Sequence, residues 1–236
     1  MGQLLTDTPA TALAVFAHPD DADISCGGAL AAWAARGCAS HVVIVNQGDK
    51  GAAAPGVDAG RLAERRAGEA REAAAALGLA GVELLGYPDG EVENDLALRA
   101  RLVAVIRRLR PEVVVAPDPT AVFFGSGYVN HHDHRAVGWA VLDACVPAAA
   151  SPLYFPAAGE AHAVRELLLS GTLEADVWVD VAGALAAKVA AVQCHRSQVG
   201  EQAGLVGEFV RRRAAEMGAQ AGVEYAEAYR RIALRG

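Results

Sequence analysis

Hydrophobic residues in this chain of 236 alternate between short continuous runs and longer stretches with helical spacing. The runs have the length and the β-branched content of strands that are covered on both faces. They lie at 11–17, 40–45, 82–85 and 112–116. The stretches with helical spacing end at a glycine or shortly before a proline. They reach residue 36 after the first run, and then cover 61–77 and 96–109. The alternation predicts an α/β fold with a doubly wound, mostly parallel sheet and helices on both faces.

The C-terminal part of the chain has a weaker pattern. Strands are expected at 152–155 and 176–181, and 166–169 stays open between strand and helix. Helices are expected at 184–195, 205–217 and 225–234. The small-residue segment 52–60 is expected to be a loop. The length fits one α/β domain that spans residues 1–236.

Composition narrows the class of protein. The chain is 53% hydrophobic and 21% charged, and its net charge of −7 argues against nucleic acid or an anionic membrane as a partner. Its four cysteines are far apart, as expected of reduced thiols in a cytoplasmic protein. We expect no signal peptide, because the N-terminus lacks a basic segment and a long apolar core. No apolar run is long enough to span a bilayer.

A cluster of polar residues follows the first predicted strand. His18, Asp20, Asp21 and Asp23 lie between this strand and the next helix. Ligands of open α/β sheets bind at the carboxyl ends of strands, which is where this cluster falls. One imidazole and several carboxylates can supply half of a divalent-metal site with an acid/base group beside it. A solvated turn is an equally good interpretation of the motif alone.

A second cluster, 130–134, follows the strand at 112–116 and contains three histidines. If Asn130 caps a helix that runs to residue 144, His131 and His134 share one helix face. An exposed polar helix start is the alternative. Because both clusters follow predicted strands, one sheet edge can bring them together. His18, Asp21 and one histidine of the second cluster would then form a metal centre with open positions for water and substrate.

These motifs resemble those of the PIG-L/LmbE-like N-acetylglucosaminyl deacetylases, which are zinc-dependent enzymes with a Rossmann-like fold. The resemblance covers nearly the whole chain. It rests on AHPDD at 17–21 and on H-x-D-H at 131–134. Supporting segments are R-x-x-E at 66–69, LLGYPDG at 84–90 and HRSQ at 195–198. His132 stands where the family usually has proline, which adds an imidazole near the metal.

The resemblance implies roles for individual residues. The implied zinc ligands are His18, Asp21 and His134. Asp20 is implied as the general base, and His131 as the residue that faces the oxyanion or the leaving amine, with Asp133 orienting it. Either Asp20 or His131 would protonate the amine. The chemistry agrees with this division, because a cation makes water a usable nucleophile near neutral pH and an uncoordinated carboxylate can accept its proton. Other divalent metals such as Fe²⁺ suit the same ligands.

Four further residues have two interpretations each. Arg66 resembles a substrate-contacting arginine, but a salt bridge on a helix face explains it equally well. Asp89 is either a plain turn residue or an acceptor for sugar hydroxyls. Tyr128 either packs on its loop or reaches the reaction intermediate. His195 is best explained as a cap at a helix C-terminus, with a role in the site as the alternative.

The sequence thus predicts a zinc-dependent hydrolase that removes the N-acyl group of a small amino-sugar derivative, such as an N-acetylglucosaminide. A non-haem iron(II) enzyme with the same two-histidine, one-carboxylate site is the main alternative, although such enzymes normally use a β-sandwich. A nucleotide-binding module is a second alternative, but HPDD replaces the glycine-rich turn that it needs. An inactive metal-binding relative is a third. The exposed side of the C-terminal elements is the candidate surface for homo-oligomer contacts.

Overall fold

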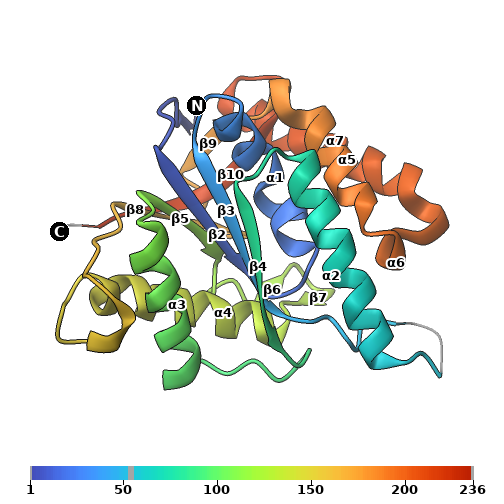
Figure 1. Ribbon diagram of the computed structural model, residues 1–236. Helices are drawn as coiled ribbons and strands as arrows, with labels where there is room; N and C mark the ends of the chain where they lie inside the picture. Colours follow the sequence, from blue (N-terminus) through green and yellow to red (C-terminus); the bar gives the residue numbers. More distant parts are fainter. Residues whose placement is uncertain (1, 53–55, 235–236) are drawn as a thin grey trace.

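An eight-stranded sheet runs through the centre of the molecule, and helices cover both of its faces (Figure 1). The computed structural model describes residues 2–52 and 56–234. The strands follow the order β1 (Gln3–Leu4), β9 (Val177–Asp180), β10 (Ala226–Ala233), β8 (Glu166–Ser170), β5 (Val113–Pro117), β2 (Thr11–Phe16), β3 (Ala39–Asn46) and β4 (Gly81–Tyr87). A separate hairpin consists of β6 (Phe123–Phe124) and β7 (Tyr128–Val129).

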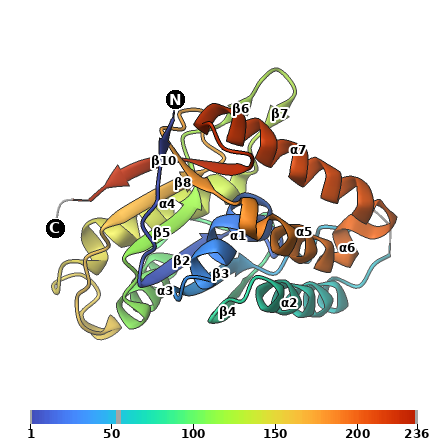
Figure 2. The same cartoon turned by 90° about the horizontal axis from the view of Figure 1, so that it is seen from above.

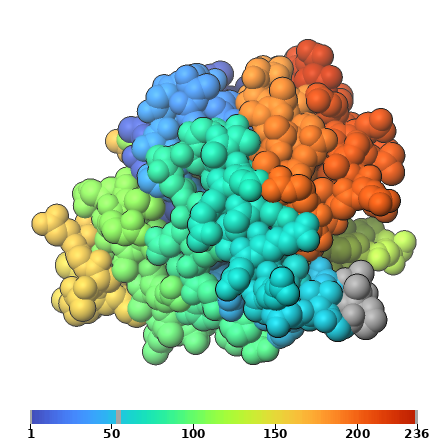
Figure 3. Space-filling model, turned by 45° about the vertical axis from the view of Figure 1, so that its right-hand side comes forward, coloured from blue at the N-terminus to red at the C-terminus, as the bar shows by residue number. Residues whose placement is uncertain are grey.

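The helices form two layers, one on each face of the sheet (Figures 1 and 2). The first layer contains α1 (Asp21–Ala34), α2 (Ala59–Ala76), α5 (Leu185–Cys194), α6 (Arg196–Val199) and α7 (Ala203–Ala221). The second contains α3 (Leu96–Leu109), α4 (His132–Asp143) and the π-helical segment η1 (Ala144–Ala149). Short 3₁₀ turns are η2 (Pro156–Ala158), η3 (Ala182–Ala184) and η4 (Gly200–Gln202). Figure 3 shows the orange C-terminal helices lying directly against the teal α2.

The alternation of side chains along β2 explains the two layers. Leu13 and Val15 pack into the core under α3 and α4, whereas Ala14 and Phe16 pack into the core under α1. Successive residues of a strand point to opposite faces, so a continuous apolar run is what a sheet covered on both sides requires. The predicted fold class is confirmed.

Parallel pairing places four loops at one edge of the sheet. β2 pairs in parallel with β3 and β5, and β3 pairs in parallel with β4. The carboxyl ends of these strands therefore meet at the same edge. The segments that follow them hold His18 after β2, Asn46 at the end of β3, Asp89 after β4 and Asp118 after β5. Both predicted polar clusters reach this edge.

Two C-terminal predictions are wrong. Residues 226–233 form β10 rather than part of a helix, and this strand inserts antiparallel between β8 and β9. Residues 152–155 form turns rather than a strand, and Phe155 has a left-handed φ of 46°, which a strand cannot accommodate. Residues 166–169, for which the sequence allowed either a strand or a helix, belong to strand β8. The predicted strand at 176–181 is confirmed as β9. Residues 53–55 of the loop predicted at 52–60 lie outside the described residues.

Buried polar contacts fasten α1 to the C-terminal half of the chain. Both carboxylate oxygens of Glu227 accept hydrogen bonds, from the backbone N–H groups of Gly28 and Ala29, each at 2.8 Å. Lys188 donates to Glu227 Oε1 at 2.5 Å and to the carbonyl of Ile24 at 2.7 Å. A Cβ at Gly28 would lie 2.8 Å from Glu227 Oε1, so this close approach requires glycine.

Among the helices of residues 2–52 and 56–234, none combines the length and the apolar character that crossing a membrane requires.

Candidate metal and catalytic site

The turn between β2 and α1 is closed by hydrogen bonds between His18 and Asp21. The backbone N–H of Asp21 donates to the carbonyl of His18 at 3.3 Å, and the N–H of His18 donates to Asp21 Oδ2 at 2.8 Å. Asp21 and Asp23 lie in the first turn of α1, where the helix dipole favours negative charge. The local fold therefore presents an imidazole and a carboxylate together at the sheet edge.

Three side chains from the two polar clusters form a compact triangle of ligand atoms. His18 Nδ1 lies 3.1 Å from His134 Nε2, and Asp21 Oδ2 lies 3.2 Å from each of these nitrogens. Ligands of a tetrahedral ion with bonds of about 2.0–2.1 Å stand about 3.3 Å apart. The atoms thus already have the separation that one bound cation needs, and the structure brings the three predicted ligands together.

The remaining ring nitrogen of each histidine faces an oxygen acceptor. His18 Nε2 lies 3.0 Å from Asp89 Oδ1, and His134 Nδ1 lies 3.0 Å from Asn130 Oδ1. Asn130 is itself held by a bond from its Nδ2 to the carbonyl of Ala121 at 2.8 Å. Such acceptors fix the tautomer of a ligating histidine and leave its other nitrogen free for a metal. Asp89 and Asn130 therefore support the two imidazoles.

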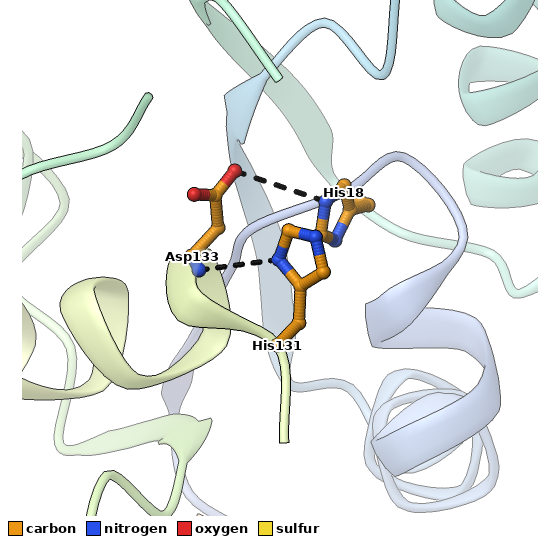
Figure 4. A group of neighbouring side chains, drawn as sticks. All are labelled: His18, His131 and Asp133. Atoms are coloured by element: carbon orange, nitrogen blue, oxygen red, sulfur yellow. Dashed lines mark hydrogen bonds and ion pairs between the residues drawn. The ribbon is translucent and has the colours of Figure 1, made fainter. Parts of the chain in front are cut away.

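His18, His131 and Asp133 form a second group that could hold a metal ion (Figure 4). Its contacts are looser, with His18 Nε2 3.8 Å from Asp133 Oδ2. The Asp133 carboxylate is fully buried and already accepts from Asn46 Nδ2 and the Gly90 N–H, both at 2.8 Å. A carboxylate occupied by these donors is a poor ligand, so the first triangle is the better metal site.

The imidazole of His131 contacts the backbone of Asp133 and not its carboxylate. The N–H of Asp133 donates to His131 Nδ1 at 3.2 Å, whereas the Asp133 carboxylate lies toward His18 (Figure 4). That carboxylate accepts from Asn46 at the end of β3 and from Gly90 after β4. His131, not Asn130 as expected, is the N-cap of α4. His131 therefore lies just before the helix and does not share a regular helical face with His134.

Asp20 lies beside the triangle and is held by Arg66. Arg66 Nη2 donates to Asp20 Oδ1 at 3.0 Å, and its Nη1 donates to the carbonyl of Gly48 at 3.0 Å. The arginine side chain is buried, while that of Asp20 is 20% exposed. Gly48 has a φ of 61°, and a Cβ there would lie 2.3 Å from Arg66 Nη1, so this approach also depends on glycine. Arg66 thus makes a salt bridge within the site rather than on an exposed helix face.

Two cavities flank the ligand triangle. The polar cavity has a volume of about 500 Å³. Its lining includes His18, Asp20, Lys50, Arg66, Asp89 and Gln198. The apolar cavity has a volume of about 390 Å³. Its lining includes Phe16, Pro117, Phe124, Tyr128, Phe209 and His134. Asp21 lines both cavities, so the triangle lies between them.

His195 is the C-cap of α5, as predicted. Its imidazole is buried and makes a further contact, with Nε2 2.6 Å from Asp23 Oδ2. Two residues further on, Ser197 donates to both oxygens of Glu69, from its N–H at 2.9 Å and from its hydroxyl at 2.5 Å. These contacts join α5 and α6 to α1 and α2 behind the metal site.

The charges at the site favour a cation. Burial lowers the pKa of His18, but its hydrogen bonds to Asp21 and Asp89 outweigh burial and raise that pKa to about 10. Burial raises the pKa of Asp21, but the imidazoles of His134 and His18 hold it far below its usual range. The pKa of His131 is lowered by burial and by the positive charge of His18. The carboxylates thus create a negative potential that a divalent ion can neutralise.

Two histidines and one carboxylate, with a second carboxylate beside them at the edge of a parallel α/β sheet, form an arrangement that is typical of metal-dependent hydrolases. The family model for GlcNAc-PI de-N-acetylases (PIG-L) matches residues 13–145, more than half of the chain. The chain belongs to this family. The match confirms the predicted family and the predicted enzyme class, a de-N-acetylase that hydrolyses an amide bond.

Similar proteins extend the likeness beyond residue 145. A diacetylchitobiose deacetylase of Thermococcus kodakarensis is 29% identical, and the match covers 92% of this chain and 81% of that protein. A 1D-myo-inositol 2-acetamido-2-deoxy-alpha-D-glucopyranoside deacetylase of Rhodococcus opacus is 32% identical over 79% of this chain and 81% of its own length. The solved structure of the N,N'-diacetylchitobiose deacetylase of Pyrococcus horikoshii superimposes with a TM-score of 0.86 at 26% identity, and the match covers 95% of this chain and 84% of that one.

Sequence reasoning missed several supporting residues. Asn46, which donates to Asp133, and Lys50, which donates to the carbonyl of Asp89 at 2.6 Å, were not singled out. Both follow or end a predicted strand, and that position was the signal that could have identified them. Asn130 was identified only as a helix cap, because its contact with His134 depends on how the loop before α4 folds.

Proposed function

We propose that this chain is a zinc-dependent hydrolase that removes the N-acetyl group, or a related N-acyl group, from a small amino-sugar derivative such as an N-acetylglucosaminide. Water adds to the amide carbon, the C–N bond breaks, and a carboxylate and an amine that gains a proton are released. The observation that carries the proposal is the triangle of His18, Asp21 and His134 with Asp20 beside it. The deacetylase relatives support the choice of amino sugar.

His18, Asp21 and His134 would hold the metal through one nitrogen, one oxygen and one nitrogen. Imidazole and carboxylate ligands suit zinc, and they also accept iron(II) or cobalt(II). When bound, the metal supplies positive charge that lowers the pKa of water and polarises the substrate carbonyl. The acceptors Asp89 and Asn130 keep the two imidazoles in the tautomers that coordination requires.

Asp20 acts as the general base in this proposal. Its Oδ1 is engaged by Arg66, which leaves Oδ2 to accept the proton of the attacking water. Arg66 also keeps the carboxylate in one orientation, because the guanidinium is buried and bound to the Gly48 carbonyl as well. Asp20 can then return the proton to the departing amine.

His131 faces the developing negative charge in this proposal. Its Nδ1 accepts the N–H of Asp133, so the neutral imidazole carries its proton on Nε2. An Nε2–H group can donate to the oxyanion or to the leaving nitrogen. Asp133 positions this imidazole through its backbone, and its buried carboxylate fixes the start of α4.

The polar cavity is the proposed site for the sugar. Arg66, Asp89 and Lys50 line it and can bond hydroxyl groups, and Tyr128 approaches from the other side of the triangle. The four cysteines are free, as suits a cytoplasmic enzyme that acts on small molecules. We also propose that the exposed C-terminal helices form the contacts between copies of this chain in a homo-oligomer.

Amine release from N-acetylated sugars tests the proposed function. Protein stripped with a chelator is assayed with and without added Zn²⁺ on N-acetylglucosamine, N,N'-diacetylchitobiose and an N-acetylglucosaminyl-inositol. We expect equal amounts of amine and acetate from at least one sugar, and only with metal present. Metal-loaded protein that releases no amine, or that consumes oxygen with Fe²⁺, would refute the proposal.

A further inference from the structure

The ligand triangle separates two cavities of opposite character. The polar cavity is lined mainly by charged and amide side chains, whereas four apolar rings of the other cavity come from Phe16, Pro117, Phe124 and Phe209. A substrate amide that reaches the metal site has two substituents on its C–N unit, the sugar on nitrogen and the acyl chain on carbon. In a trans amide these two groups extend in opposite directions, so they occupy different cavities.

Chemistry decides which group enters which cavity. Sugar hydroxyls need hydrogen-bonding partners, and Arg66, Lys50 and Gln198 of the polar cavity can supply them. An alkyl chain gains free energy by leaving water for an apolar surface. The apolar cavity therefore suits the acyl chain.

The polar groups nearest the metal in the apolar cavity are already used by the protein. The side chain of Asn130 is hydrogen-bonded to His134 and to the Ala121 carbonyl. The hydroxyl of the buried Ser170 donates to the Ala116 carbonyl at 3.3 Å. Ser25, Tyr128 and Arg213 also line the cavity, and the apolar surface that an entering alkyl chain meets comes from Phe16, Pro117, Phe124 and Phe209.

The apolar cavity is much larger than an acetyl methyl needs. Its volume of about 390 Å³ lies in the range of roughly 300–1,000 Å³ that is typical of sites for drug-sized ligands. It also shares Ser25, Gly171, Phe209 and Arg213 with a neighbouring cavity of about 520 Å³ between α1, α7 and β10. A chain that starts at the metal can therefore continue past Phe209.

We propose, on the basis of the proposed deacylation, that the apolar cavity is an acyl-chain site and that the enzyme prefers unbranched N-acyl groups longer than acetyl. Phe209 is the residue that sets this preference. It projects from α7, is 45% exposed, and lines both of these cavities. Phe209 lies outside residues 13–145, which the family model matches, whereas Phe16, Pro117 and Phe124 of the same cavity lie inside them.

Acyl-chain length provides the first test. The value of kcat/KM is measured for N-acetyl-, N-butyryl- and N-hexanoylglucosamine with Zn²⁺-loaded enzyme. We expect a rise of about threefold to fourfold for each added methylene, because burying one is worth about 0.8 kcal/mol. The hexyl glycoside of N-acetylglucosamine, which carries an alkyl chain of similar length on the other side of the amide, should show no such rise.

Variants on α7 locate the site. Phe209→Ala should lower the hexanoyl-to-acetyl ratio of kcat/KM about tenfold, because it removes one apolar wall. Leu205→Ala is the matched control, since Leu205 is an exposed apolar residue one turn earlier that lines neither connected cavity. Ser25→Leu, which places a larger side chain where the two cavities share their lining, should also lower the ratio. Calorimetric binding of hexanoate relative to acetate should follow the same order without turnover.

The outcomes separate this inference from the proposed function. If acetyl substrate is cleaved but the hexanoyl substrate is cleaved more slowly, the acyl-chain site is wrong and the deacetylase remains. If the hexyl glycoside gains instead of the N-hexanoyl sugar, the apolar cavity holds the aglycone and the inference is overturned. An unchanged ratio in Phe209→Ala overturns the role of Phe209. A protein that cleaves no N-acyl sugar overturns both proposals.

Discussion

Asp20 and Asp21 are neighbours in the sequence, yet the structure gives them separable roles. Asp21 Oδ2 is a corner of the ligand triangle, 3.2 Å from both imidazole nitrogens, whereas Asp20 Oδ1 is bound to Arg66. We therefore expect Asp21→Asn to lose the metal and Asp20→Asn to retain it. Asparagine is chosen at position 20 because its amide oxygen can still accept the Arg66 bond, so the buried guanidinium keeps a partner.

The magnitudes follow from what each carboxylate does. A residue that merely supports a metal ligand costs 10–100-fold in affinity when removed, so loss of a ligand itself should cost more than about 100-fold. Loss of a general base lowers kcat by about 10²–10⁴-fold, which corresponds to about 2.7–5.5 kcal/mol of barrier. Asp20→Asn should therefore show nearly unchanged metal content and a kcat reduced by at least a hundredfold.

Two measurements on the same protein samples test whether Asp20 and Asp21 have separate roles. Metal content is determined by mass spectrometry after gel filtration with a competing chelator, and kcat is determined from amine release at saturating Zn²⁺. Asp89→Asn is the intermediate control for metal content, since Asp89 contacts His18 Nε2 but is not a corner of the triangle. Equal metal loss in the Asp20 and Asp21 variants would contradict the division of roles. So would an Asp20→Asn enzyme with kcat within about tenfold of the wild type.

Three further predictions concern support of the site and stability. Asn130→Ala should weaken Zn²⁺ affinity about 10–100-fold, as measured by chelator competition, because one ligand imidazole loses its acceptor; unchanged affinity would contradict this. Glu227→Gln should lower the free energy of urea unfolding by about 3–5 kcal/mol, since the buried Lys188 loses its counter-charge. Glu83→Gln, which breaks an ion pair on the surface, should lower it by only about 0–1 kcal/mol. Equal losses of stability in the two variants would contradict this prediction. Burial raises the pKa of Cys145 from 9.0 to about 12, so folding favours the neutral thiol, and its contribution to stability is present below pH 9 and lost as the pH rises to about 12. Cys145→Ala should show a smaller loss of stability over that window in denaturant titrations, and a parallel loss in both proteins would count against this role.

The sheet and the metal triangle could be predicted because their signals are local. The apolar run before His18 and the polar residues after it mark a strand end, and parallel strands bring such ends to one edge. The AHPDD and H-x-D-H motifs then identified the three atoms that the structure places 3.1–3.2 Å apart. Identifying the triangle therefore needed no knowledge of which distant side chains contact one another.

The failures occurred where tertiary contacts override local preference. Segment 225–234 has helix-forming residues, but β8 and β9 offer unpaired edges on both sides, and pairing with them makes it a strand. Segment 152–155 is turned because Arg107, buried under it, collects the carbonyls of Ser151 and Tyr154 at 2.8 Å each. The contact of His195 with Asp23 joins residues 172 positions apart, which no local pattern reports.

The fastening of α1 has a consequence for where a working unit of this protein can end. The family match stops at residue 145, but α1, which begins with Asp21, is hydrogen-bonded to Lys188, Glu227 and His195. A fragment cut after the matched region would keep His18, Asp21 and His134, the proposed metal ligands, and yet lack the groups that hold α1 in place. The smallest active version of this enzyme must therefore extend through β10, almost to the end of the chain.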